Sequence, residues 1–166
     1  MGNNQFLSIG AIALLALISL RFNKTVLENK TTEIENKVYL TAFSLADDLI
    51  EEIKQKAFDE QTVEWKAIKE TNLSPYESFG TVDPGEYSVN DFDDIDDYDQ
   101  YSKSVSLPHA ESYNVTSTVD YVTEGNQNTI SSTQTFFKRV TINVESPYMS
   151  HSIKLSFIFT LHSKWG

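Results

Sequence analysis

The sequence predicts an α+β protein in which a long N-terminal helix packs on a C-terminal antiparallel β-sheet. Three observations support this. No proline precedes Pro75 and no glycine lies between Gly10 and Gly80, so nothing interrupts a helix over the first 57 residues. The apolar positions of that helix change from a continuous run to a stripe along one face. Three alternating segments follow near the C-terminus, and alternation is typical of strands with one buried face.

The first half of the helix is apolar all round. Phe6–Leu20 holds fifteen uncharged residues, fewer than the ~20 that cross a bilayer core. The span is long enough only if Arg21 and Lys24 extend their charged ends to the interface. We expect residues 1–27 to insert in a membrane and to bind copies of the same chain. The residues expected to pack between subunits are Phe6, Ile9, Ala13, Leu14 and Leu17.

Two features of this segment bear on targeting. Met1–Gln5 has no basic residue and no A-x-A site follows the apolar run, so we favour a retained anchor over a cleaved signal peptide. By the positive-inside rule, Arg21 and Lys24 would keep the C-terminal part of the chain in the cytoplasm. This orientation conflicts with export of the C-terminal part, unless a basic leader before Met1 has been removed.

The second half of the helix, 28–57, carries the apolar stripe at spacings of three and four residues. A connector over 58–82 contains Pro75 and Gly80. An acidic loop over 83–112 begins with the sequence Asp83–Gly85, which predicts a turn. The sheet is expected over 113–162, with strands near 113–121, 136–144 and 153–161. The body is thus 28–166. Its predicted core is Ile34, Val38, Ala42, Leu45, Leu49 and Ile53 on the helix, and Val140, Ile142, Leu155, Phe157 and Phe159 on the strands.

Composition excludes several classes of function. The net charge is −11, and residues 58–166 hold 7 basic against 17 acidic side chains. Such a body repels nucleic acid, so we expect no nucleic-acid partner. Without cysteine there is neither a disulfide nor a thiol nucleophile. No nucleophile elbow or phosphate-binding glycine loop occurs, and we expect no enzymatic activity.

The acidic loop is the one segment that suggests ligand chemistry. Six aspartates occur in the nine residues Asp91–Asp99. Phe92, Ile95 and Tyr98 lie three apart, which predicts a helical turn that points them to the core and the aspartates to water. The alternative is a Ca²⁺ site, since Ca²⁺ prefers clustered carboxylate oxygens. Its expected ligands are Asp94, Asp96 and Asp97.

The remaining candidate residues are interpreted as structural. An EF-hand is excluded because no glycine lies between Gly85 and Gly125. The three histidines have no metal-ligand spacing, and we expect them at the surface or as caps. The two tryptophans are expected to pack. These residues are His109, His151, His162, Trp65 and Trp165.

Three features of the chain are shared with a known family: the long N-terminal helix, the stretch Tyr39–Ile53 running into Phe58–Glu60, and the acidic segment Asp91–Asp99. In these features the chain resembles the type IV pilin and pseudopilin superfamily, and it is most similar to minor pilins of the mannose-sensitive haemagglutinin type. Family members carry Glu at the fifth mature position, and if Met1 is the first mature residue, this chain has Gln5 there. The neutral amide would bind a neighbour's N-terminal amine more weakly.

The resemblance implies a structural subunit of a type IV pilus-like filament, inserted in the inner membrane before assembly and exposed at the cell surface afterwards. Its partners would be copies of itself or related pilins. The alternative is a membrane-anchored pseudopilin or accessory protein of a secretion system that does not form long fibres.

Overall fold

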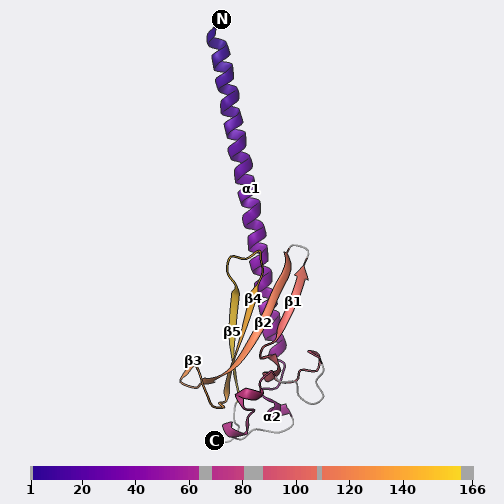
Figure 1. The fold of residues 1–166 in the computed structure, drawn as a ribbon. Coiled ribbons are helices and arrows are strands. Elements are labelled where there is room, and N and C mark those ends of the chain that lie inside the picture. The colour runs from indigo at the N-terminus through magenta and orange to yellow at the C-terminus, as the bar shows by residue number, and fades with distance from the viewer. Residues whose placement is uncertain (1, 64–68, 81–87, 108–109, 162–166) are drawn as a thin grey trace.

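A computed structural model describes residues 2–63, 69–80, 88–107 and 110–161. Helix α1 (Gly2–Ile53) is a single 52-residue rod, and at 1.5 Å per residue it is about 80 Å long. Its N-terminal half extends away from the rest of the chain, and its C-terminal half lies along the sheet (Figure 1). The predicted continuous helix is therefore confirmed, except that it ends at Ile53 rather than at residue 57.

The sheet is antiparallel and has five strands. They are β1 (Ser102–Leu107), β2 (Ala110–Thr123), β3 (Asn126–Ile130), β4 (Phe137–Glu145) and β5 (Ile153–Thr160). Their order is β1-β2-β4-β5, with β3 pairing to β2 beside this path. Val119, Val140 and Phe157 lie opposite one another across β2, β4 and β5, so the alternating residues share one face.

The core lies between that face and the lower half of α1, which is the part from Val38 to Ile53. The first buried residue on the helix is Val38, and the stripe continues through Ala42, Leu49 and Ile53. The predicted strand residues Val140 and Ile142 are fully buried. Leu45, Leu155 and Phe159 are partly buried against this cluster. The predicted packing of the stripe under the sheet is confirmed for these positions.

Two predicted core residues are corrected. Ile34 is 55% exposed, because the sheet covers α1 only from Val38 onward and Ile34 lies one turn beyond that point. Phe157 is 37% exposed. It lies on the edge strand β5, where one side of the ring has no neighbouring strand, and the Lys54 Nζ atom lies 4.3 Å from its centroid.

Segments predicted as loops contain further structure. Strand β1 falls inside the expected acidic loop and β3 inside the expected turn between two strands, so the predicted three-stranded sheet was too small. The connector contains α2 (Glu60–Val63) and two 3₁₀ turns, η1 (Glu70–Asn72) and η2 (Tyr76–Ser78). A third, η3 (Asp96–Tyr98), lies in the acidic loop. Of the residues interpreted above, Asp83–Gly85, His109, His162, Trp65 and Trp165 lie outside the described residues.

Candidate functional site

The first candidate site is the upper half of α1, which is the part from Gln5 to Lys37 that extends away from the sheet. Every residue from Gln5 to Lys37 is exposed, and Val38 is the first buried one. Of the predicted subunit-packing residues, Phe6, Ile9, Leu14 and Leu17 are 60–75% exposed, and Ala13 is also exposed. By length and composition this is the one helix in the described part of the chain that can cross a membrane.

A shallow hollow marks the start of this apolar segment. It is lined by Phe6, Leu7, Gly10, Ala11 and Leu14. Nothing lies within 4 Å of the position where Gly10 would carry a Cβ atom. Small residues of this kind let two helices approach closely in an apolar environment.

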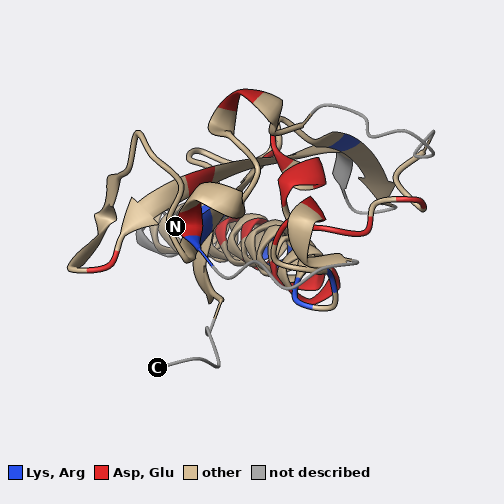
Figure 2. Ribbon diagram, turned by 90° about the horizontal axis from the view of Figure 1, so that it is seen from below, with Lys and Arg blue, Asp and Glu red and all other residues tan. Residues whose placement is uncertain are grey.

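The second candidate site is the acidic loop, which is buried rather than solvated. Asp94, Asp96, Asp97 and Asp99 are all buried, so the expectation that the loop's aspartates face water is wrong for these four. The expectation for the apolar residues is confirmed, since Ile95 and Tyr98 are buried and Phe92 is partly buried. Figure 2 shows the ribbon from this end of the body, with the positions of acidic residues coloured red.

Backbone contacts from the connector bury the loop. The Ala57 N–H donates to Asp93 O at 2.9 Å, and the Ile95 N–H donates to Ala57 O at 3.0 Å. On the other side the Gly80 N–H donates to Asp96 O at 3.0 Å. Gly80 has φ +65°, and a Cβ there would lie 2.5 Å from Asp99 O. The close approach of connector and loop therefore requires glycine.

A lysine that the sequence reading missed lies at the centre of this region. Lys138 is 0% exposed, and its Nζ donates to Asp59 Oδ2 at 2.7 Å, to Phe58 O at 2.8 Å and to Asp96 Oδ1. The ammonium also lies 4.9 Å from the ring centroid of Phe79. The sequence does carry an indication of this burial, because Lys138 lies two residues before Val140 and therefore on the same, inward face of β4.

Asp59 is the best-satisfied acid around Lys138. Its Oδ1 accepts from the Gln61 N–H and from Ser74, and its Oδ2 accepts from the Tyr121 hydroxyl at 3.0 Å. Burial alone would raise the pKa of Asp59, but the charge and hydrogen bond of Lys138 and the Ser74 N–H outweigh it and lower the pKa. Asp59 and Lys138 thus form an ionised buried pair.

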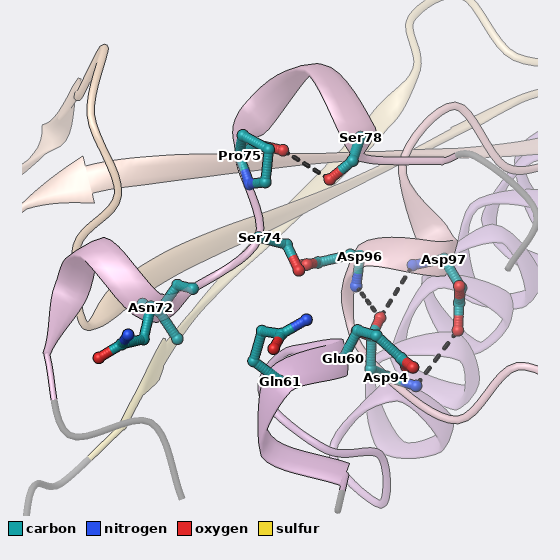
Figure 3. Close-up of a pocket in the computed structure, with 10 residues that line it drawn as sticks. Glu60, Gln61, Asn72, Ser74, Pro75, Ser78, Asp94, Asp96 and Asp97 are labelled. Carbon is teal, nitrogen blue, oxygen red and sulfur yellow. Dashed lines mark hydrogen bonds between the residues drawn. The ribbon is translucent and has the colours of Figure 1, made fainter. Parts of the chain in front are cut away.

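Asp94 and Asp97 hold the turn together through the backbone. Asp94 Oδ1 accepts from the N–H groups of Asp96 and Asp97, at 2.6 and 3.2 Å. Asp97 Oδ2 accepts from the N–H groups of Asp93 and Asp94, at 3.0 and 3.2 Å. These bonds fix the carboxylates relative to the turn (Figure 3).

Two carboxylate oxygens in this cluster have no partner. Asp94 Oδ2 and Asp96 Oδ2 are buried without a hydrogen bond. Burial and the charge of Asp97 raise the pKa of Asp94 to about 7. Burial also raises the pKa of Asp96 to about 9, although Lys138 opposes the shift.

Asp94, Asp96 and Asp97 line one cavity of about 250 Å³ (Figure 3). The predicted ligands are therefore brought together. Across residues 2–63, 69–80, 88–107 and 110–161, however, no group of three acidic, histidine or cysteine side chains is placed to hold a metal. The remaining wall is formed by Glu60, Gln61, Asn72, Leu73, Ser74, Pro75 and Ser78.

The one histidine that the structure describes serves as a contact between helix and loop. His151 Nδ1 lies 2.9 Å from Ser150 Oγ and 3.2 Å from the Tyr39 hydroxyl. It is exposed, as expected for a surface or cap position.

Comparison with models of protein families, with curated protein sequences and with solved structures finds no match for this chain. The arrangement of a long apolar N-terminal helix on an antiparallel sheet is compatible with a pilin-like fold.

Proposed function

We propose that this chain is a structural subunit of a type IV pilus-like filament at the cell surface, assembled through the upper half of α1. One observation carries the proposal. The segment from Gln5 to Lys37 contributes no residue to the core of its own chain, yet its first half is as apolar as a core.

The cost of leaving that segment in water is large. Burying one large apolar side chain yields about 1.5–3 kcal/mol. Such a segment is stable only in a membrane or against other apolar helices. In this proposal the membrane covers the apolar surface before assembly, and the helices of neighbouring subunits cover it afterwards. The large apolar side chains exposed between Phe6 and Leu20 are Phe6, Leu7, Ile9, Ile12, Leu14, Leu15, Leu17, Ile18 and Leu20.

The charge of the body supports an outward position in such a filament. With 17 acidic against 7 basic residues over 58–166, neighbouring bodies repel one another unless salt screens them. The attraction between subunits must therefore come mainly from α1. This also predicts that assembly is stronger at high ionic strength.

A second candidate function is a membrane-anchored pseudopilin or accessory protein that forms no long fibre. The length and composition of α1 support it, since this is the helix, among the described residues, that is long and apolar enough to cross a membrane. The two candidates differ in where the chain ends up. A filament subunit leaves the membrane for sheared fibres, and an anchored protein stays in the membrane fraction.

The test is to substitute Ala13→Asp in the full chain in cells that express it. A carboxylate in the packed apolar segment should abolish fibres, as seen by electron microscopy and in the sheared fraction. The matched control is Thr32→Asp, the same added charge on an exposed residue of α1 outside the apolar run, which should leave fibres normal. Normal fibres from Ala13→Asp would contradict the proposal. A wild-type chain that remains in the membrane without fibres would favour the second candidate.

A further inference from the structure

One amine and two carboxyl groups are held in contact in the interior of the body. The Lys138 Nζ atom donates to Asp59 Oδ2 at 2.7 Å and to Asp96 Oδ1. The side chains of Lys138 and Asp59 are 0% exposed, and that of Asp96 is 9% exposed. A buried amine in direct contact with a buried carboxyl has the two groups that amide formation requires.

Aromatic rings enclose the amine and keep water away from it. The ring centroids of Phe58, Phe79 and Tyr121 lie 4.6, 4.9 and 5.2 Å from Lys138 Nζ, and all three residues are buried. In water an amine and a carboxyl exist as hydrated ions that do not react with each other. Burial removes the hydration that stabilises those ions. The interior therefore brings the neutral amine and the neutral carboxyl within reach, and these are the reactive forms.

The two carboxyl groups have different surroundings. The carboxylate of Asp59 accepts hydrogen bonds from Ser74 and from the Tyr121 hydroxyl, besides the one from the lysine. Within the described residues, the Asp96 carboxyl accepts a hydrogen bond only from Lys138, and its Oδ2 atom has no partner. A negative charge is most stable where most donors meet it. Asp59 is therefore the carboxylate and Asp96 the neutral carboxylic acid, the form whose carbon an amine attacks.

We propose that Lys138 Nζ and Asp96 Cγ join in an intramolecular isopeptide bond, with Asp59 as the proton acceptor. The ammonium passes one proton to Asp59 Oδ2, and the freed lone pair of Nζ attacks Asp96 Cγ. The bond from Cγ to Oδ2 then breaks, and the hydroxyl leaves as water with a second proton from Nζ. An ammonium, a carboxylate and a carboxylic acid become an amide, a carboxylic acid at Asp59 and one water, so atoms and charges balance.

The oxygen that leaves is the one that nothing holds. Asp96 Oδ2 has no hydrogen bond to break. Asp96 also lines the cavity of about 250 Å³ beside the turn (Figure 3), which has room for the released water. Groups held in a productive orientation react as if present at about 10⁵–10⁸ M. Contact and exclusion of water could therefore drive the reaction without another protein.

The bond would tie η3 covalently to β4. It closes a loop of the chain that contains β1, β2 and β3. A cross-link of this kind restricts the unfolded chain, as a disulfide does in other proteins, and this chain has no cysteine. In linked chains Lys138 and Asp96 no longer titrate, and Asp94 keeps the raised pKa described above. This inference is independent of filament assembly.

The experiment measures the mass of the full chain, extracted in detergent and denatured before ionisation. The intact mass should be lower, by one water molecule, than the mass calculated from the amino acids. Trypsin cuts after Lys103, which lies between the two linked residues. The tryptic peptide that contains Asp96 should nevertheless stay attached to the peptide that contains Lys138.

Three variants locate the reacting groups. Lys138→Met removes the amine, and the chain should have its full calculated mass. The matched control is Lys37→Met, an exposed lysine paired with Glu33, which should lose one water as the wild type does. Asp59→Asn cannot take up the proton, and most of its chains should stay unlinked.

Four outcomes would overturn the proposal. A wild-type chain of full mass with separate peptides would show that the group is only an ion pair. Loss of water that persists in Lys138→Met would place the loss elsewhere, as in a succinimide at an aspartate. A peptide joined at Asp59 would identify the other carboxyl as the one attacked, and complete linkage in Asp59→Asn would remove its role as proton acceptor. If Lys138→Met does not fold, the wild-type peptide map still decides whether the bond exists.

Discussion

The two halves of α1 share one unbroken backbone but have opposite environments. From Gln5 to Lys37 every side chain is exposed, and from Val38 to Ile53 one face is buried against the sheet. The exposed half nevertheless contains the long apolar run Phe6–Leu20. The apolar residues of this run surround the helix, whereas those from Val38 to Ile53 form a stripe with acidic residues opposite.

This difference separates folding from assembly. The lower half has one apolar face, which its own sheet covers, so it contributes to the free energy of folding. The run Phe6–Leu20 has apolar residues on all sides, and no single sheet face could cover them. A helix of that kind belongs in a membrane or among other helices. Val38 is therefore the point on α1 where burial within the chain begins.

The largest effect expected from this comparison follows removal of the upper segment. A chain beginning at residue 28 should lose assembly completely and still fold, because the described core begins at Val38. It should elute as a monomer in size-exclusion chromatography without detergent and give a cooperative thermal transition. An unfolded or aggregated 28–166 chain would show that the upper half also supports the body.

A second large effect is expected inside the body, at Lys138. Substitution Lys138→Met leaves Asp59 and Asp96 buried without their cation. Removing one partner of a buried pair costs on the order of 3–5 kcal/mol of the free energy of unfolding. Chemical denaturation of the full chain in detergent would measure this loss.

The control for Lys138 is a lysine on the exposed part of the same molecule. Lys37 pairs with Glu33 at 2.8 Å, and both side chains are exposed. Lys37→Met should leave the free energy of unfolding nearly unchanged, because water screens such pairs. Similar losses from both substitutions would contradict the role given to the buried cluster.

A third prediction compares two leucines of α1. Leu49 is buried under the sheet, and Leu40 is 70% exposed on the same helix. Leu49→Ala should cost on the order of 2–5 kcal/mol, whereas Leu40→Ala should change the stability of the isolated chain little. Equal costs, measured by the same denaturation, would mean that the stripe does not define the buried face.

How far the sequence predicts this molecule depends on how strongly each segment alternates. The stripe through Val38, Leu49 and Ile53 and the inward residues of β4 repeat at helical or strand periods, and these were predicted correctly. Strand β1 reads Ser-Lys-Ser-Val-Ser-Leu and β3 is exposed throughout. Edge strands bury too few side chains to leave a clear pattern, so the sequence predicts loops at both places.

The acidic cluster could be predicted only in part. The spacing of Ile95 and Tyr98 correctly placed them in the core. It could not show that the connector covers the other side of the turn, because that depends on long-range bonds from Ala57 and Gly80. Nor does any local pattern link Asp59 to Lys138, which lie 79 residues apart. The sequence could have indicated only Lys138, because the alternation of β4 places this charged residue on the inward face.

A further expected effect is a pH dependence of stability. The pKa values of Asp94 and Asp96 are raised to about 7 and about 9 from 3.8. Above about pH 4 the unfolded chain therefore releases protons that the folded chain keeps. The free energy of unfolding should fall as pH rises toward 7, by at most about 1.4 kcal/mol per pH unit for each carboxyl.

Asp59 acts in the opposite direction, since its lowered pKa gives stability that is lost only as pH falls below about 4. Asp94→Asn should therefore flatten the decline between pH 5 and 7, and Asp93→Asn should not. Urea denaturation of the wild type and both variants at pH 5, 6, 7 and 8 measures these effects. A wild-type chain equally stable at pH 5 and pH 8 would mean that the two buried carboxyls are ionised over this whole range.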